Sequence, residues 1–183
     1  MFNSFTADEC FQKFVDLSLD YLTYFTLENI QEDQMENALF AAGCFWGVEE
    51  TFRKVPGVLS TEVGYTGGYT DRPTYKQVCT GSTGHAEAVM ITFNPEIISF
   101  EKLLDIFWKI HNPTTLNAQG PDIGTQYRSA IFYFDEKQKS MAESSRNSFN
   151  LTSRYSSQAV TEITPFTKFF PAEEYHQKYL QKN

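Results

Sequence analysis

The residues around Cys44 combine a nucleophilic side chain with a backbone position that can activate it. Cys44 follows Gly43, where a short apolar segment, residues 38–42, gives way to the apolar spacing of a helix. Only the thiolate form of cysteine is a good nucleophile, and the N–H groups at a helix start lower the pKa of a thiol. The pattern therefore predicts a strand, a tight glycine turn and a helix that begins with a reactive thiol. The same spacing also fits an inert core cysteine beside Phe45 and Trp46.

Histidines and acids elsewhere in the chain do not form a recognisable metal motif. His85 and Glu87 resemble half of a zinc deaminase signature, but the Pro-Cys-x-x-Cys half is absent. His111 and His176 are far apart and lack ligand spacing. A Cys–His hydrolase centred on Cys44 would need a third, orienting residue, and the sequence does not single one out. We therefore predict no metal site.

Several short blocks, in order, resemble those of the A-type peptide methionine sulfoxide reductases. Gly43-Cys44-Phe45-Trp46-Gly47 resembles the active-site signature of that family. The other matching blocks are residues 64–68, 74–78, 84–87, 111–114, 119–124, 126–129, 161–163 and 172–177, so that the resemblance extends over about residues 37 to 180. It implies an enzyme that reduces the S-epimer of methionine sulfoxide, free or in proteins, and so repairs oxidative damage.

The resemblance also implies a role for seven side chains. They are the nucleophile Cys44, the acid Glu87, Tyr75 and Tyr127 near the sulfoxide oxygen, Phe45 and Trp46 around the methyl group, and Asp122 in the same polar site. These residue types suit the chemistry, because a soft thiolate attacks sulfur and the oxygen must be protonated to leave as water. A carboxyl group whose pKa is raised by burial supplies that proton. The reaction needs no cofactor.

The route by which Cys44 is regenerated departs from the pattern common in the family. The attack leaves Cys44 as a sulfenic acid, which a second thiol must reduce. Many family members carry that thiol in a C-terminal tail, whereas no cysteine follows Cys79 in this chain. We expect an external thiol to act: thioredoxin, glutaredoxin or a small thiol. The first alternative is Cys10. The second is Cys79, which we expect to lie in a strand-like and packed setting.

A second class of function stays open at this point. The chain could bind oxidised methionine, or signal through oxidation of Cys44, without efficient turnover. The missing tail cysteines favour this alternative. The set of Glu87, Tyr75 and Tyr127 favours the enzyme, because a thiol sensor does not need an acid and two phenols.

Composition limits the partners and the compartment. The chain has 183 residues, of which 41% are hydrophobic, enough for one domain with a sizeable core. Its net charge is −8 and it lacks a Lys/Arg cluster, which argues against nucleic acid and against anionic membranes as partners. The first residues do not resemble a secretory signal, and three cysteines do not make a disulfide framework. We expect a cytoplasmic monomer.

Strands and helices alternate along the chain with long connections, which predicts an α+β fold. We expect residues 1–36 to form an N-terminal helical extension, with a capping box at Thr6 and Glu9, and residues 37–183 to form the catalytic domain. The expected strands are 38–42, 58–65, 87–93, 129–134 and 159–163, and the expected helices begin at Cys44, Phe100, Asp135 and Ala172. These elements predict a two-layer mixed sheet with packed helices, and the resemblance implies a ferredoxin-like-related reductase A fold.

Overall fold

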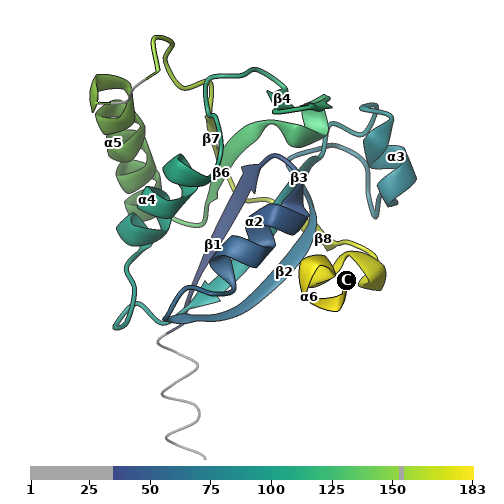
Figure 1. Cartoon of the computed structure of the whole chain (residues 1–183), viewed down its shortest axis with the longest axis horizontal. Coiled ribbons are helices and arrows are strands. Elements are labelled where there is room, and N and C mark those ends of the chain that lie inside the picture. The colour runs from purple at the N-terminus through teal and green to yellow at the C-terminus, as the bar shows by residue number, and fades with distance from the viewer. Residues whose placement is uncertain (1–34, 153–154) are drawn as a thin grey trace, which may run out of the picture. The chain divides into compact units, whose positions relative to one another are not determined.

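The structure is a computed structural model that describes residues 35–152 and 155–183 (Figure 1). Glu36–Asn183 forms one compact unit that contains all the elements described below. The helical extension and the capping box predicted for the first residues lie outside the described part of the chain. Within that part, no helix is both long and apolar enough to cross a membrane.

A six-stranded mixed sheet is the centre of the unit, as the sequence predicts. Its strands lie in the order β7, β6, β1, β3, β2, β8, and only the β6–β7 pair is parallel. The bounds are β1 Glu36–Ala42, β2 Val58–Thr66, β3 Ala86–Phe93, β6 Ser129–Tyr133, β7 Glu162–Pro165 and β8 Phe169–Pro171. A separate hairpin joins β4 (Ala118–Gln119) to β5 (Asp122–Ile123).

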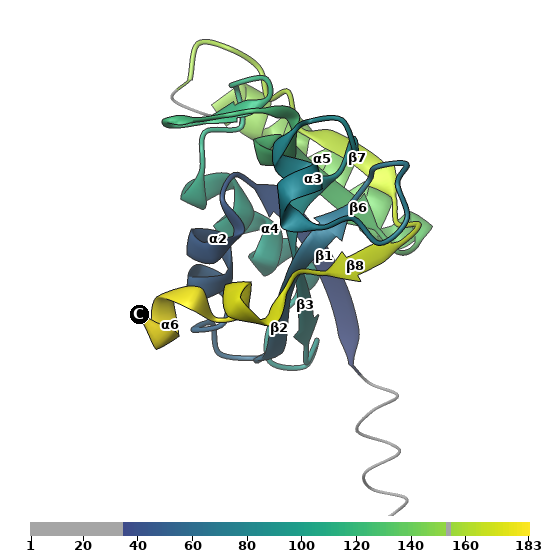
Figure 2. The ribbon, with the colours of Figure 1, turned by 90° about the vertical axis from the view of Figure 1, so that its right-hand side faces the viewer.

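The main helices cover one face of this sheet, which makes the fold a two-layer α+β architecture (Figures 1 and 2). The helical elements are α2 Phe45–Phe52, α3 Tyr75–Cys79, α4 Phe100–Ile110, α5 Glu136–Thr152 and α6 Tyr179–Lys182, with 3-10 turns at Thr125–Tyr127 and Glu174–His176. The core between the layers is aromatic: the ring of Phe40 on β1 lies within 5.9 Å of those of Phe52, Phe100 and Phe107. This packing anchors α2, and therefore Cys44, on the sheet.

The connection between the predicted strands 58–65 and 87–93 contains a short helix, α3, which the sequence analysis does not anticipate. Its start carries a capping box in which the Thr74 hydroxyl and the Gln77 side chain bond each other's backbone N–H groups. The helix predicted to begin at Asp135 is present, and the Asp135 carboxylate caps it by accepting a hydrogen bond from the backbone N–H of Gln138 at 2.7 Å.

The prediction of a continuous helix that begins at Ala172 is wrong. Residues 172–183, called here the C-terminal segment, form a 3-10 turn, an extended residue and then α6. Lys178 has a left-handed backbone (φ 51°), which interrupts any continuous helix. The Gln177 side chain pairs with both backbone groups of Val63 on β2, at 2.9 and 2.8 Å. These bonds to a distant strand override the helical pattern, and in Figure 1 the segment lies beside α2.

Candidate active site

Cys44 stands between β1 and α2, at the end of the sheet where β4 and α3 also lie (Figure 1). Gly43 makes the turn with φ +92°, a conformation that side chains disfavour. A Cβ atom at this position would lie 2.6 Å from Cγ of Gln119, so the close approach of β4 also requires glycine. Cys44 is the N-cap of α2, as the sequence predicts, and its side chain is half-buried.

The expected lowering of the thiol pKa is not observed. Burial raises the pKa of Cys44 above its ordinary value and outweighs the lowering effect of the Trp46 and Gly47 N–H groups at the helix start. The carboxylates of Glu87 and Asp122 raise it further. The helix start therefore only partly offsets burial, and a thiolate at Cys44 is favoured when the neighbouring carboxyl groups are neutral.

Glu87 lies on β3 and is 1% exposed. One carboxylate oxygen accepts a hydrogen bond from the backbone N–H of Phe45, the residue after Cys44, at 3.2 Å. Burial raises the pKa of Glu87 to about 7; the Phe45 N–H opposes this rise, and the charge of Asp122 adds to it. A carboxyl group that titrates near neutrality beside a thiol is suited to donate a proton at physiological pH.

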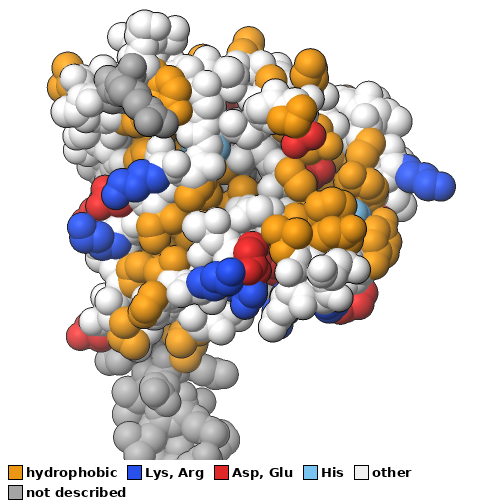
Figure 3. All heavy atoms as spheres, in the orientation of Figure 1, with side chains coloured by type: hydrophobic (Ala, Val, Ile, Leu, Met, Phe, Trp, Pro, Cys, Tyr) orange, Lys and Arg blue, Asp and Glu red, His pale blue; other side chains and the backbone are white. Residues whose placement is uncertain are grey.

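The two tyrosines and Asp122 come from three separate elements: Tyr75 begins α3, Asp122 begins β5 and Tyr127 ends a 3-10 turn. Their charges or hydroxyl groups interact with Glu87. Burial raises the pKa of Tyr127 to about 12, and the nearby charges of Glu87, Asp122 and Cys44 contribute. Burial also raises the pKa of Tyr75, assisted by its hydrogen bond to Cys79 and by the charge of Glu87. Both phenols are therefore neutral donors at physiological pH. Figure 3 shows hydrophobic side chains around acidic ones at this end of the molecule.

Phe45 and Trp46, the predicted apolar part of the site, are the first two residues of α2. Phe45 is buried, with its ring 6.0 Å from that of Tyr65 and 5.2 Å from that of His176. Trp46 is half-buried and stacks on Tyr179 at 3.8 Å with an interplanar angle of 10°. The indole N–H donates to Nδ1 of His176 at 3.1 Å, so that the Trp46 ring is held in one orientation.

The C-terminal segment contributes residues to the site that the sequence analysis does not assign. Besides His176 and Tyr179, it supplies Glu173, which accepts hydrogen bonds from the Tyr65 hydroxyl and the Tyr75 N–H, both at 2.9 Å. The only signal in the sequence for Glu173 and His176 is the family-like block at residues 172–177, to which the resemblance assigns no role, and Tyr179 lies beyond that block.

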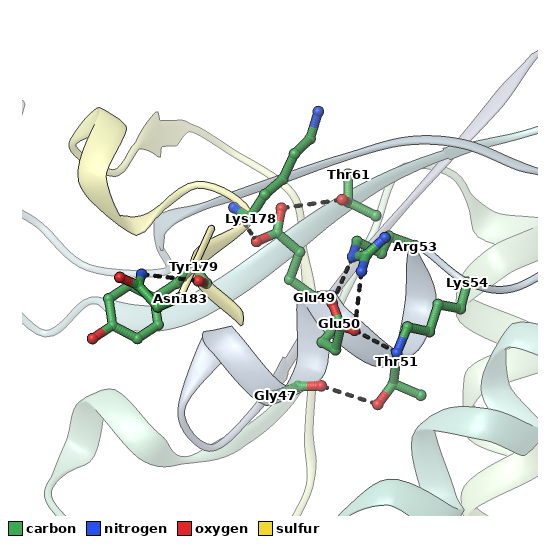
Figure 4. A network of polar contacts seen from close by, with 10 residues as sticks. All are labelled: Gly47, Glu49, Glu50, Thr51, Arg53, Lys54, Thr61, Lys178, Tyr179 and Asn183. Carbon is green, nitrogen blue, oxygen red and sulfur yellow. Dashed lines mark hydrogen bonds and ion pairs between the residues drawn. The ribbon is translucent and has the colours of Figure 1, made fainter. Parts of the chain in front are cut away.

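A buried acid on α2 also holds the C-terminal segment in place (Figure 4). Glu49 is 1% exposed, and its carboxylate accepts hydrogen bonds from the Lys178 N–H at 2.7 Å and the Thr61 hydroxyl at 3.1 Å. The helix that presents Cys44 and the segment that supports Trp46 are thereby joined directly.

The three histidines have structural partners. His85 accepts a hydrogen bond from the Gly68 N–H and bonds the Thr70 carbonyl, which holds the glycine turn. His111 bonds the Phe107 carbonyl and the Ser129 hydroxyl, and burial lowers its pKa to about 4. Within residues 35–152 and 155–183, no group of three or more His, Cys, Asp or Glu side chains is arranged to hold a metal ion.

Cys79 is not in the packed, strand-like setting expected from the sequence. It is the last residue of α3 and is exposed, and its thiol is hydrogen-bonded to the Tyr75 hydroxyl. The reason is local, because the Thr74 capping box starts a helix that ends at Cys79. Cys10 lies outside the described residues.

Comparison with known proteins shows the family to which the chain belongs. Residues 36–183 match the family model described as peptide methionine sulfoxide reductase. The chain belongs to this family. Its peptide methionine sulfoxide reductase MsrA relatives include one from Methanothermobacter thermautotrophicus, 57% identical over 81% of this chain and 88% of that protein. Another, from Geobacter sulfurreducens, is 51% identical over 83% and 94%.

Solved structures of the family share the fold. Reduced Mxr1 from Saccharomyces cerevisiae superimposes with a TM-score of 0.78 at 36% identity, covering 82% of this chain and 87% of that chain. Methionine sulfoxide reductase A of Corynebacterium diphtheriae gives the same TM-score and identity, covering 82% and 76%. As a member of the family, this peptide methionine sulfoxide reductase reduces methionine sulfoxide to methionine and is recycled by a thiol. The predicted activity is confirmed, and family membership favours the enzyme over the alternative of a sensor without turnover.

Proposed function

We propose that Cys44 attacks the sulfoxide and that Glu87 protonates the departing oxygen. The observation that supports this pair best is the hydrogen bond from the Phe45 N–H to a buried Glu87 whose pKa lies near 7. That bond holds an acid one residue away from the nucleophile, at the start of the same helix. The proposal applies to the S-epimer, free or within oxidised proteins.

The chemical step uses the proton that Glu87 holds. The Cys44 thiolate attacks the sulfoxide sulfur while the carboxyl proton passes to the oxygen, and Tyr75 and Tyr127 donate hydrogen bonds to it. The oxygen moves to Cys44 as a sulfenic acid, and methionine leaves with the electron pair of the broken bond. The sulfoxide methyl group lies against Phe45 and Trp46, where sulfur–aromatic contacts are favourable, and Asp122 completes the polar side.

Loss of the proton from Glu87 opposes this step in two ways. An ionised Glu87 cannot donate a proton to the oxygen, and its charge raises the pKa of Cys44. The productive state is therefore a neutral Glu87 beside a thiolate. It carries the same net charge as the resting pair of thiol and carboxylate, so that reaching it needs only a proton shift within the site.

We further propose that a thioredoxin-type protein dithiol returns Cys44 to the thiol, with glutaredoxin or a small thiol as the alternatives. The first dithiol sulfur forms a disulfide with Cys44 and the second releases it. A solved structure of Mxr1 from Saccharomyces cerevisiae is a complex with Trx2. The need for a reducing thiol supply favours a cytoplasmic location, and we propose that the enzyme acts as a monomer.

The single-turnover rate of Glu87→Gln tests the proposal. Loss of general acid help should slow formation of the Cys44 sulfenic acid by roughly a hundred- to ten-thousandfold. Alkylation of Cys44 by iodoacetamide, which needs no proton donor, should not slow. A variant that forms the sulfenic acid at the wild-type rate would show that Glu87 has a structural role only.

A further inference from the structure

One cavity that touches Cys44 is lined by residues that do not include the acid Glu87. This open cavity of about 250 Å³ is lined by α2, the end of α4 and the β4–β5 hairpin. Its lining residues are Ala42, Cys44, Gly47, Val48, Thr51, Ile110, Gln119 and Asp122. Glu87, Tyr75, Tyr127, Phe45 and Trp46 are not among them. The proposed sulfoxide site and this cavity therefore share Cys44 and Asp122 but otherwise have different walls.

We propose that this cavity is the entry for the reducing thiol, and that sulfoxide and reductant reach Cys44 from different sides. The inference rests on the assignment of Cys44 as the nucleophile. Displacement at a divalent sulfur proceeds with the incoming and leaving atoms in line. The sulfenic oxygen comes from the sulfoxide and is placed toward Glu87 and the two phenols. A thiol that displaces it must therefore approach from the opposite side.

The step balances without any further reactant. The incoming thiol gives up its proton, and a proton taken from solvent restores the Glu87 carboxyl group that the first half of the cycle left ionised. The thiolate then gives its electron pair to the Cys44 sulfur, the S–O bond breaks, and the oxygen leaves as water with the proton from Glu87. Cys44 then stands in a mixed disulfide with the reductant. The second thiol of the reductant attacks its partner sulfur, releases the Cys44 thiolate and leaves as an intramolecular disulfide.

The walls of the cavity indicate which reductant fits it. Gly47, Val48, Thr51, Ile110 and Gln119 carry no charge, and Asp122 adds a negative one. The chain as a whole has a net charge of −8. An anionic small thiol is therefore disfavoured, whereas an uncharged cysteine on an apolar loop of a protein dithiol matches the lining. We commit to such a loop as the occupant.

Thr51 offers a way to block the cavity without touching the proposed sulfoxide site. It lies one turn after Gly47 on α2, and its hydroxyl donates to the Gly47 carbonyl at 3.0 Å (Figure 4). Thr51→Trp adds bulk to the cavity wall, and Thr51→Ser keeps the hydroxyl as the conservative control. Lys54→Trp, at a side chain that is 62% exposed, places the same ring near the end of α2 and outside the cavity lining.

The experiment separates the two halves of the cycle. Methionine formed in one turnover without reductant measures the first half, and the second-order rate at which thioredoxin removes the sulfenic acid measures the second. For Thr51→Trp, methionine should form in the first turnover at the wild-type rate. The second-order rate of sulfenic acid reduction by thioredoxin should fall on the order of ten- to a hundredfold, which is the effect of holding reacting atoms about 1 Å out of place. Thr51→Ser and Lys54→Trp should match the wild type in both.

Three results would overturn the proposal. Reduction by thioredoxin at the wild-type rate in Thr51→Trp would show that the reductant uses another route. A parallel loss in the first turnover would show that the cavity belongs to the sulfoxide site. A Cys10–Cys44 disulfide that forms in the wild type but not in Thr51→Trp would show that the cavity admits a thiol of this chain instead. Failure of Cys44 as the nucleophile would be seen separately, as an unchanged first turnover in Cys44→Ser.

Discussion

Replacing Glu87 with Gln should change how the stability of the fold depends on pH. The carboxyl group is 1% exposed, and burial raises its pKa from 4.5 to about 7. Between these values the unfolded chain has lost this proton and the folded chain still holds it, so that stability falls as the pH rises. Above pH 7 both states are ionised and the effect is constant. At about 1.4 kcal/mol for each pKa unit, the ionised group destabilises the fold by about 3 kcal/mol.

Urea unfolding of the wild type and Glu87→Gln between pH 4 and 8 measures this effect. The amide oxygen of Gln can still accept the Phe45 N–H, so that the variant keeps the hydrogen bond without the titration. From pH 4 to pH 8, the free energy of unfolding of the variant should rise by about 3 kcal/mol relative to that of the wild type. Glu96→Gln, at an exposed position, is the matched control and should follow the wild type. If the difference between the Glu87 variant and the wild type did not change with pH, the reasoning would be wrong.

Three further substitutions test other parts of the site. Cys44→Ser should lose at least about two decades of sulfoxide reduction and keep the fold, because a neutral hydroxyl is a poor nucleophile; circular dichroism and steady-state turnover check both. Trp46→Ala should raise the Michaelis constant most for free methionine sulfoxide, which has little else to bind; an unchanged constant would place the methyl group elsewhere. Cys10→Ser and Cys79→Ser, singly or together, should leave turnover with dithiothreitol nearly unchanged, since an external dithiol needs neither. A stoichiometric Cys10–Cys44 disulfide, detected by mass spectrometry after one equivalent of sulfoxide, would contradict that expectation.

The parts of the site that depend on local signals could be predicted from the sequence. Gly43 and the apolar spacing after Cys44 place the thiol at a helix start, because the turn and the helix are both short-range structures. The assembly of Glu87, Tyr75 and Tyr127 around it followed only from the family resemblance, since they come from elements distant in sequence. The short helix α3 also has a local signal, the Thr74 capping box, which is readable once the spacing to Gln77 is noticed.

Two features could not be predicted because they depend on distant partners. The C-terminal segment has a helical pattern, but Gln177 bonds Val63 and Glu49 bonds the Lys178 N–H, more than a hundred residues away in each case. The pKa of Cys44 depends on how deeply the turn is buried and on the carboxylates that face it. The position of Cys44 at a helix start indicates only the contribution that lowers the thiol pKa. The direction of the pKa shift that the sequence predicts is therefore wrong.

The way the C-terminal segment is attached has a consequence for local unfolding. Its links to β2, α2 and α3 are mostly bonds between a side chain and the backbone, made by Gln177, Glu49 and Glu173. Segments held in this way open at a lower free energy than strands in the middle of a sheet. Each opening would free Trp46 from Tyr179 and His176 while the sheet stays folded. Enzymatic activity should therefore disappear at a lower urea concentration than the far-ultraviolet circular dichroism signal, and amide hydrogen exchange should be faster in residues 172–183 than in β1 and β3.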